Sequence, residues 1–449
     1  MRRPVWALHA LAVGLALHNL AMAELWDAGV RGAALDVLSA WKEALAALCL
    51  VALFARGLRA FRWRGCDALA LAYAAVVVVW ALLPQGWLGG HATARGAVLG
   101  ARHDLVPVAA YFLGRGLALA DGELRRLGAT VVAAAAGVAA FGLVDVYAIP
   151  LSWWRGSGAP GWFRDQLGFH YFGLSGLPEN FVYNTGDERP LRRLVSTFLS
   201  PLASSYMLVV ALLLAAAWLL RRRPPLALWV PVAALLLAGL LWTHARSSFL
   251  ALALGLTALA LARREAWLPL VAAAAVVLVT SAVFVRAYPH VAPSARFTPS
   301  ELAEQRRHAH ETGRAATSGL SDASISSHWR SLRAGIRTVL RHPQGFGVGN
   351  AGSTAARTGV EVEAGESTYT ELGVDAGLAG ALLFAGWSLV LLRVVLPRVA
   401  WVGAALAAVL ALGLQTDVVG VPWLAYVVFA LAGTAVTRAL PPPARTGPS

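Results

Sequence analysis

Long apolar stretches alternate with short polar ones along most of the chain. Twelve of these stretches are long enough to cross a membrane as a helix, which takes about 20 apolar residues. They lie at residues 5–23, 37–55, 67–84, 98–119, 128–149, 196–219, 225–243, 246–262, 267–285, 370–392, 399–416 and 418–437. The pattern therefore predicts an all-α, polytopic integral membrane protein with about twelve transmembrane helices.

Two longer segments, at residues 150–195 and 286–369, interrupt this alternation. Aromatic residues dominate the first, namely Trp153, Trp154, Trp162, Phe163, Phe169, Tyr171 and Phe172. Because aromatic side chains gather at membrane interfaces, this segment is predicted to lie in the headgroup layer or to form a platform for sugars. The second segment opens with a charged run at residues 301–314. We divide the chain into residues 1–225, 226–396 and 397–449.

The end of the second segment combines a helix, a glycine-rich turn and a carboxylate. Residues 324–341 have the spacing of an amphipathic helix, with an apolar face of Leu332, Ile336, Val339 and Leu340. His342 and Pro343 end this helix, and the glycines at 345, 347 and 349 predict a turn whose backbone can approach a ligand closely. Glu366 follows, just before the next apolar stretch. We expect polar chemistry to concentrate here.

Composition and charge support a membrane protein over a nucleic-acid-binding one. Hydrophobic residues make up 58% of the 449 residues, and the net charge is +14. The basic residues fall in alternate inter-helix loops, as the positive-inside rule requires of cytoplasmic loops. They are Arg2, Arg3, Arg56, Arg59, Arg62, Arg64, Arg115, Arg125, Arg126, Arg221 to Arg223, Arg263, Arg264, Arg393, Arg398 and Arg438. Both termini are therefore predicted to be cytoplasmic and both long segments external.

The N-terminus and the cysteines add little chemistry. Residues 1–23 resemble a signal peptide, with a basic start, an apolar run and Ala21-Met22-Ala23, but we favour a retained first helix because residues 5–23 nearly suffice to span. Cys49 and Cys66 indicate neither a disulfide nor a metal site. The sequence contains no P-loop or dinucleotide fingerprint and no external D-x-D cluster, so no cofactor and no metal are expected.

Arginines at predicted outer helix ends are candidate anion ligands. Arg246 follows Thr243-His244-Ala245, where it could equally snorkel to the interface. Arg102 lies beside His103 and Asp104 within an apolar stretch, and a local Arg102–Asp104 ion pair is the alternative. The external cluster of Arg189, Arg192 and Arg193 runs against the positive-inside rule, and lipid headgroup binding explains it as well as catalysis does.

Three motifs occur in an order that resembles the O-antigen ligase and Wzy-type polysaccharide polymerase family. They are THARSSFLAL at 243–252, HPQGFGVGN at 342–350 and LGVDAGLAGALLF at 372–384. The resemblance covers residues 226–386. It implies that Arg246 holds the diphosphate of a lipid-linked glycan, for which a forked guanidinium is suited. Arg102, Arg192, Arg193 and Arg330 are further candidates for this diphosphate.

The chain departs from the family pattern at two positions. Many ligases of this family place Arg near position 328 and His near position 366, whereas this chain has His328 and Glu366. Either residue could act as the general base that an attacking acceptor hydroxyl needs, so both are predicted to be catalytic. The alternative is that His328 lies at a helix N-cap and Glu366 caps the next helix.

The resemblance implies a metal-independent glycosyltransferase on the outer face of a bacterial inner membrane. Its donor would be an undecaprenyl-diphosphate-linked oligosaccharide, and its acceptor a second glycan or lipid A-core. The carboxylate at Glu366 favours an exopolysaccharide or O-antigen polymerase over a ligase. Membrane lipids and a chain-length regulator protein are further expected partners. The competing prediction is a transporter or a lipid-linked glycan flippase, against which stand the long external segments and the lack of buried charges or broken helices.

Overall fold

The computed structural model describes residues 4–55, 61–169, 181–183, 190–220, 225–295 and 323–438, together with Leu177, Pro299 and residues 302–303. Outside this part of the chain lie Arg2, Arg3, Arg56, Arg59, Tyr171, Phe172, Arg189, Arg221 to Arg223 and most of the charged run. The described residues are almost entirely helical, and the only paired strands among them are the short β1 (Val182–Tyr183) and β2 (Leu191–Arg192). The predicted all-α fold is thus confirmed.

Each of the twelve predicted stretches contains a helix. The long helices are α1 (Trp6–Asp27), α3 (Trp41–Phe54), α4 (Gly65–Leu82), α6 (Ala94–Leu117), α7 (Asp121–Ala148), α10 (Pro201–Leu219), α11 (Leu226–Trp242), α12 (Arg246–Ala262), α13 (Trp267–Val291), α15 (Ala323–Arg341), α17 (Thr368–Val395) and α18 (Ala400–Leu412). Shorter ones are α2 (Ala33–Ser39), α5 (Gln85–Leu88), α8 (Leu151–Gly156), α9 (Ala159–Gly161), α16 (Gly352–Thr358) and α19 (Phe429–Val436), which continues a π-helical turn at Leu424–Val428.

Length and hydropathy identify a polytopic membrane protein. Six described helices are long and apolar enough to cross a membrane, or seven if the bent pair α2 and α3 forms one span. Four shorter apolar helices accompany them. On α13, Val276, Val279 and Val283 are each more than 60% exposed, which is expected of a surface that faces lipid. These counts leave the predicted number of twelve spans unconfirmed.

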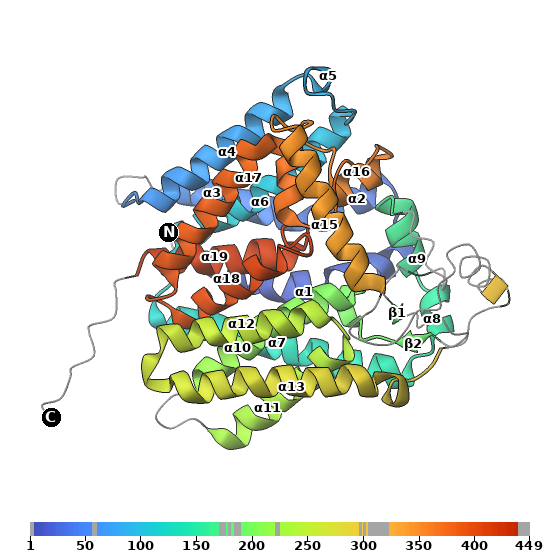
Figure 1. Ribbon diagram of the computed structural model, residues 1–449, viewed down its shortest axis with the longest axis vertical. Helices are drawn as coiled ribbons and strands as arrows, with labels where there is room; N and C mark the ends of the chain where they lie inside the picture. Colours follow the sequence, from blue (N-terminus) through green and yellow to red (C-terminus); the bar gives the residue numbers. More distant parts are fainter. Residues whose placement is uncertain are drawn as a thin grey trace, which may run out of the picture.

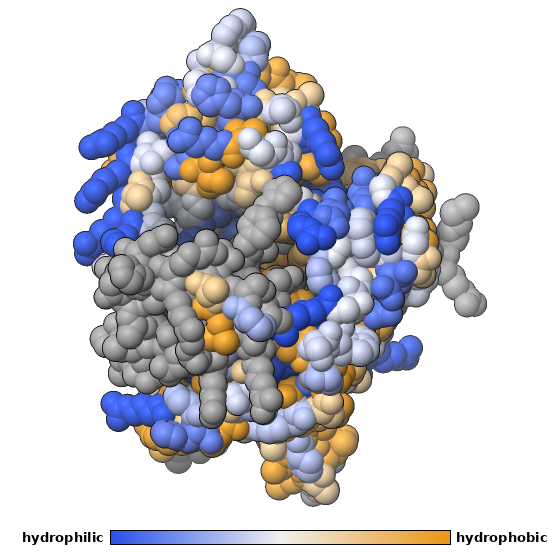
Figure 2. Space-filling view, turned by 90° about the vertical axis from the view of Figure 1, so that its right-hand side faces the viewer, coloured by the Kyte–Doolittle hydropathy of each residue, from blue (hydrophilic) through white to orange (hydrophobic). Residues whose placement is uncertain are grey.

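The ends of the helix bundle differ in character. In Figure 1 the N-terminus and the end of α19 lie on the left, whereas α2, α8, α9, α16 and the β1–β2 pair lie on the right. Figure 2 looks onto this second end and shows many hydrophilic residues gathered there. We call it the loop end. The two long segments predicted to be external contribute α8, α9, both strands and α16 to it.

Two details differ from the sequence predictions. Arg115, predicted in a cytoplasmic loop, lies inside α6, where its Nη2 is 2.8 Å from Oδ2 of the buried Asp67 on α4. Trp154 and Trp162, predicted at the membrane interface, are fully buried in a small apolar core at the loop end with Phe181. Their burial reflects packing between the first long segment and the end of α1, which gives large aromatic rings more apolar contact than the headgroup layer does.

The glycine-rich turn after α15 packs closely against neighbouring helices. Gly345, Gly347 and Gly349 all have positive φ, as predicted for a tight turn. A Cβ atom on Gly345 would lie 2.5 Å from the backbone nitrogen of Gly377, and one on Gly349 would lie 2.6 Å from the backbone of Gly96. The close backbone approach seen here is to α17 and α6, and an approach to a ligand stays a prediction.

This turn packs against a break in α17. Ala376 and Gly377 leave helical geometry, with φ of +70° at Gly377. The backbone groups freed by the break pair with the turn, because Phe346 N donates to Val374 O at 2.7 Å and Leu378 N donates to Pro343 O at 2.8 Å. Asn350 fixes the turn from inside, accepting from His91 N and Ala92 N through its Oδ1. The break and the turn thus form one unit.

Two glycines bring α15 and α17 into close contact. A Cβ atom on Gly335 of α15 would lie 2.9 Å from Cβ of Thr370, and one on Gly373 of α17 would lie 2.7 Å from Cγ2 of Val339. Absent Cβ atoms let the two backbones approach at this crossing. The contact sets the position of α15, and with it the position of His328, relative to the start of α17.

Candidate functional site

A cavity of about 630 Å³ opens at the loop end between α10, α12, α15, α16 and α17. Its described lining is rich in polar and ionisable groups, including Tyr183, Arg193, His244, Arg246, His328, Glu366, Glu371 and Asp417. Cavities that gather convergent charged groups in this way are the usual places for binding and catalysis. We call it the first cavity.

His328 and Glu366 meet in this cavity. The His328 Nδ1 atom is 2.7 Å from Oε2 of Glu366, and both side chains are partly exposed, at 38% and 42%. The hydrogen bond from His328 is the main cause that holds the pKa of Glu366 below its ordinary value, against the opposing effect of burial. Glu366 is therefore a carboxylate at neutral pH, and its partner is the imidazole.

The alternative assignment of these two residues as helix caps does not fit the structure. His328 is the sixth residue of α15 and lies inside the helix, away from any N-cap. Ser367 occupies the N-cap of α17 and has no side-chain capping hydrogen bond, while Glu366 precedes it and bonds to His328.

Two residues that line the first cavity have a strained backbone. Glu366 has φ of +73° and His244 has φ of +50°, a left-handed region that non-glycine residues occupy at a cost of about 1–3 kcal/mol. Strained residues persist only where the surrounding structure holds them, and they cluster at active sites. At Glu366 the bond to His328 and the start of α17 supply that support.

Two arginines enter the cavity from different elements. Arg246 is the first residue of α12, so the positive end of a 17-residue helix adds to its own charge. Arg193 follows β2 and is oriented by its Nε, which donates to Thr243 O at 2.9 Å. His244, between them, stacks on Tyr288 at 4.1 Å between ring centroids. The pair of guanidinium groups can bind an anion such as a diphosphate.

The other predicted anion ligands lie elsewhere. Arg192 is 3% exposed and forms an ion pair of 2.8 Å with the buried Asp145, away from the lining of the first cavity. Arg330 is exposed on α15 and does not line the cavity either. Arg102 pairs with Glu43 at 3.7 Å and is absent from the lining of the first cavity, and the alternative Arg102–Asp104 ion pair does not form.

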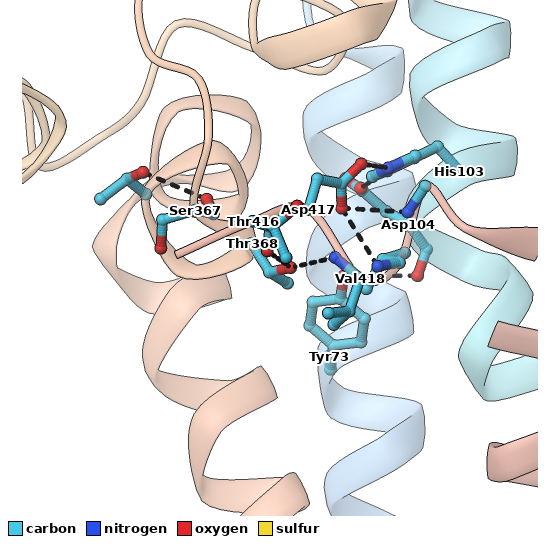
Figure 3. A network of polar contacts seen from close by, with 11 residues as sticks. Tyr73, His103, Asp104, Ser367, Thr368, Thr416, Asp417 and Val418 are labelled. Carbon is cyan, nitrogen blue, oxygen red and sulfur yellow. Dashed lines mark hydrogen bonds and ion pairs between the residues drawn. The ribbon is translucent and has the colours of Figure 1, made fainter. Parts of the chain in front are cut away.

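Asp104 instead belongs to a buried network that sequence reasoning missed. His103 lies between two carboxylates, with Nδ1 2.7 Å from Asp104 and Nε2 2.8 Å from Asp417 (Figure 3). A histidine that donates from both nitrogens is the positively charged imidazolium, which balances part of this acidic cluster. Asp417 lies just beyond an apolar stretch that ends at residue 416, and this helix-end position was the only sequence signal for it.

The same network contains the one group in the described part of the chain that could hold a metal ion. His103, Glu371 and Asp417 place one donor atom each within 4.8 Å of one another. However, both ring nitrogens of His103 already face carboxylates, so a metal would have to replace one of these hydrogen bonds. The arrangement fits a protonated histidine without further ligands.

Comparison with known proteins finds a family match for one region of the chain. Residues 231–385 match a family model described as O-antigen ligase. The protein carries an O-antigen ligase domain. The matched region agrees with the resemblance seen in residues 226–386, and the search of curated proteins found no match. The O-antigen ligase domain implies a glycan transferase of the ligase or polymerase type, acting on a lipid-linked glycan and an acceptor in a bacterial membrane.

The O-antigen ligase domain supplies Arg246, His328 and Glu366, whereas Arg193 comes from outside it. The first cavity is therefore lined by residues from inside and outside the matched region 231–385. One argument against a transporter is overturned, because α17 is broken at Gly377 and carries the buried Glu371 and Asp375. The family match, and not the helix pattern, is what favours a transferase.

Proposed function

We propose that the protein transfers a glycan from an undecaprenyl-diphosphate donor to a hydroxyl acceptor in the first cavity. The observation that carries this proposal is the convergence of a His–carboxylate pair and two arginines on one cavity at the loop end. The loop end faces the periplasm of the inner membrane, and both termini are cytoplasmic, as the distribution of arginines supports.

The reaction exchanges one bond at the anomeric carbon for another. The acceptor hydroxyl oxygen attacks this carbon, the bond to the diphosphate oxygen breaks, and the diphosphate leaves with the electron pair. The donor carries its own activated leaving group, so the reaction requires no nucleotide. Arg193 and Arg246 stabilise the negative charge that develops on the leaving diphosphate, a task that a metal ion performs in other transferases.

The His328–Glu366 pair accepts the proton of the attacking hydroxyl. In the tautomer that donates from Nδ1 to Glu366, the Nε2 atom of His328 carries the lone pair that accepts a proton. The carboxylate orients the ring and stabilises the imidazolium that forms. Carboxylates have the same two roles in other sites where a base activates a nucleophile. His328 is thus the general base and Glu366 its positioning residue.

Polymerase and ligase activity differ only in the acceptor, which is a second lipid-linked glycan or lipid A-core. We favour the polymerase because the base is a His–Glu pair in place of the Arg and His of many ligases. A polymerase of this kind would have a chain-length regulator protein as a partner.

Reconstitution of the purified protein with undecaprenyl-diphosphate-linked repeat units tests the proposal. Growth of glycan chains is expected without lipid A-core, and a parallel reaction with a chelator should proceed at the same rate. Transfer only when lipid A-core is added would identify a ligase. If the repeat units cross the membrane but no glycosidic bond forms, the protein is a flippase and the proposal is wrong.

A further inference from the structure

A second cavity of about 520 Å³ lies at the loop end beside the first. Besides the His103 imidazolium, four basic side chains line it, Lys42 of α3, Arg95 and Arg102 of α6 and Arg357 of α16. The carboxylates that line it are Asp36 and Glu43, so among the described residues positive charge exceeds negative. Like charges gathered around one cavity are unfavourable unless an anion offsets them.

The cations are held in place by specific contacts. Arg95 and Arg102 are seven residues apart on α6, which puts them on one face of the helix. Arg357 donates from Nε to Leu167 O at 2.7 Å, and its guanidinium lies 5.4 Å from the ring centroid of Phe169. Burial and the nearby Arg102 and Arg95 lower the pKa of Arg357 to about 10, so it still carries its charge at neutral pH.

The carboxylates are already shared or occupied. Glu43 is 3.5 Å from Lys42 and 3.7 Å from Arg102, so one carboxylate faces two cations. Asp36 accepts a hydrogen bond of 2.7 Å from Gln166. The guanidinium groups of Arg95, Arg102 and Arg357 carry several N–H donors each, and their forked geometry matches the oxygens of a phosphate ester.

The two cavities adjoin each other. Phe169 and Ser353 line both. His103 lines the second cavity and bonds to Asp417, which lines the first, so their side chains form part of a common wall. A molecule in one cavity is therefore within reach of a molecule in the other.

We propose that the second cavity binds a phosphate-bearing headgroup of the acceptor, so that the enzyme joins two anionic substrates, one in each cavity. The proposal rests on the proposed function for the role of the first cavity. It assigns Arg102 to the acceptor, where the sequence resemblance had suggested the donor diphosphate. An acceptor without phosphate, such as a protein hydroxyl, would be a poor substrate.

Equilibrium binding of undecaprenyl diphosphate, without sugar, tests the two sites independently of turnover. In nanodiscs of zwitterionic lipid, wild-type protein should bind two equivalents. The Arg246→Ala variant and the Arg102→Gln/Arg357→Gln variant should each bind one, and Arg263→Gln, at the opposite end, should bind two. A single equivalent in the wild type, unaffected by Arg102→Gln/Arg357→Gln, would overturn the proposal. So would displacement from the second site by phosphatidylglycerol, which would make it a site for membrane lipid.

Kinetics then assign the second site to the acceptor. With donor saturating, Arg102→Gln/Arg357→Gln should raise the KM for a phosphorylated acceptor about tenfold to a hundredfold, as expected for lost charge-assisted hydrogen bonds, while kcat changes little. An unchanged acceptor KM, or a raised donor KM in its place, contradicts the assignment. If wild-type protein shows two binding sites but no transfer, the proposed function fails while the anion site stands.

Discussion

At Glu366 a charged side chain sits on a left-handed backbone, a combination that glutamate rarely adopts. The strained turn aims the carboxylate at His328 across the gap between α15 and α17. The strained backbone at Glu366 costs about 1–3 kcal/mol of folding stability. A partly exposed His–Glu pair returns only a small part of this cost, so stability alone does not explain the geometry. Positioning of the imidazole for proton transfer gives a physical reason for this geometry.

The double variant His328→Ala/Glu366→Ala should be scarcely less active than either single variant. Loss of a general base costs about a hundredfold to ten-thousandfold in rate, and residues that act as one unit lose that rate only once. Turnover on a defined lipid-linked donor, at matched expression, measures this. Additive losses would show that the two residues act separately, and near-normal single variants would remove both from the mechanism.

The stabilisation that Glu366 provides through His328 should also depend on pH in the acid range. Because the folded-state pKa of Glu366 is depressed, its contribution is fully present above the ordinary value of 4.5 and is lost as the pH falls through the lowered value. The difference in thermal midpoint between wild-type protein and Glu366→Gln should therefore hold steady down to about pH 5 and shrink below it. A difference independent of pH across this range would contradict the hydrogen-bonded carboxylate.

Arg246→Lys should reduce activity about tenfold to a hundredfold, and Arg246→Ala should reduce it further. Lysine keeps the charge at the start of α12 but loses the fork that bonds two phosphate oxygens. Product formation is compared with that of Arg263→Gln, whose exposed side chain lies far from the cavity and which should match wild type. Near-normal product from Arg246→Ala would rule out a role in diphosphate binding.

Among elements, the crossing of α15 over α17 sets the distance between His328 and Glu366. Gly373→Ala would place a Cβ atom 2.7 Å from Val339, forcing the two helices apart. The expected cost is about 1–3 kcal/mol of stability, with a loss of activity because His328 moves away from Glu366. Thermal unfolding and turnover are measured on the same preparation.

Gly386 provides a matched control on the same helix. A Cβ atom there would meet nothing within 4 Å, so Gly386→Ala should be neutral or stabilising by up to about 1 kcal/mol. Equal effects of the two substitutions would show that the α15–α17 contact does not position the site.

The helices themselves were predictable because each is built from a long apolar run, and every predicted stretch contains one. The break in α17 was not. A glycine inside an apolar run is compatible with a continuous helix, and only the backbone groups of Pro343 and Phe346, packed from outside, favour the break at Gly377. The spacing of Gly345, Gly347 and Gly349 predicted the tight turn but not that the turn packs against α17 and α6.

At the scale of the whole molecule, the orientation in the membrane can be tested with cysteines. Cys49 and Cys66 are buried, so single new cysteines can be read against a silent background. We expect Glu361→Cys to react with a membrane-impermeant thiol reagent in intact spheroplasts, and Glu265→Cys, 71% exposed at the other end, to react only after permeabilisation. The reverse pattern would invert the topology and exclude a periplasmic active site.

The site was only partly predictable because it is assembled from distant segments. Arg246 lies in one of three motifs with a recognisable order, whereas His328 and Glu366 lie between these motifs, and the structure brings all three residues to one cavity. Arg192 and Arg193 are adjacent in sequence, yet one pairs with Asp145 in the interior and the other reaches the cavity. Sequence periodicity cannot make that distinction, because β2 is only two residues long and Arg193 already lies beyond it.

The contact between the break in α17 at Gly377 and the glycine-rich turn at residues 342–350 limits where chimeras with related proteins can be joined. Because Pro343 and Phe346 complete the hydrogen bonds that α17 loses at Gly377, a chimera that takes one partner alone would leave buried amides and carbonyls unmatched. Residues 342–378 form an indivisible cassette for such an exchange. Crossover points within it would yield misfolded hybrids, while a swap of the entire cassette would carry the orientation of Glu366 with it.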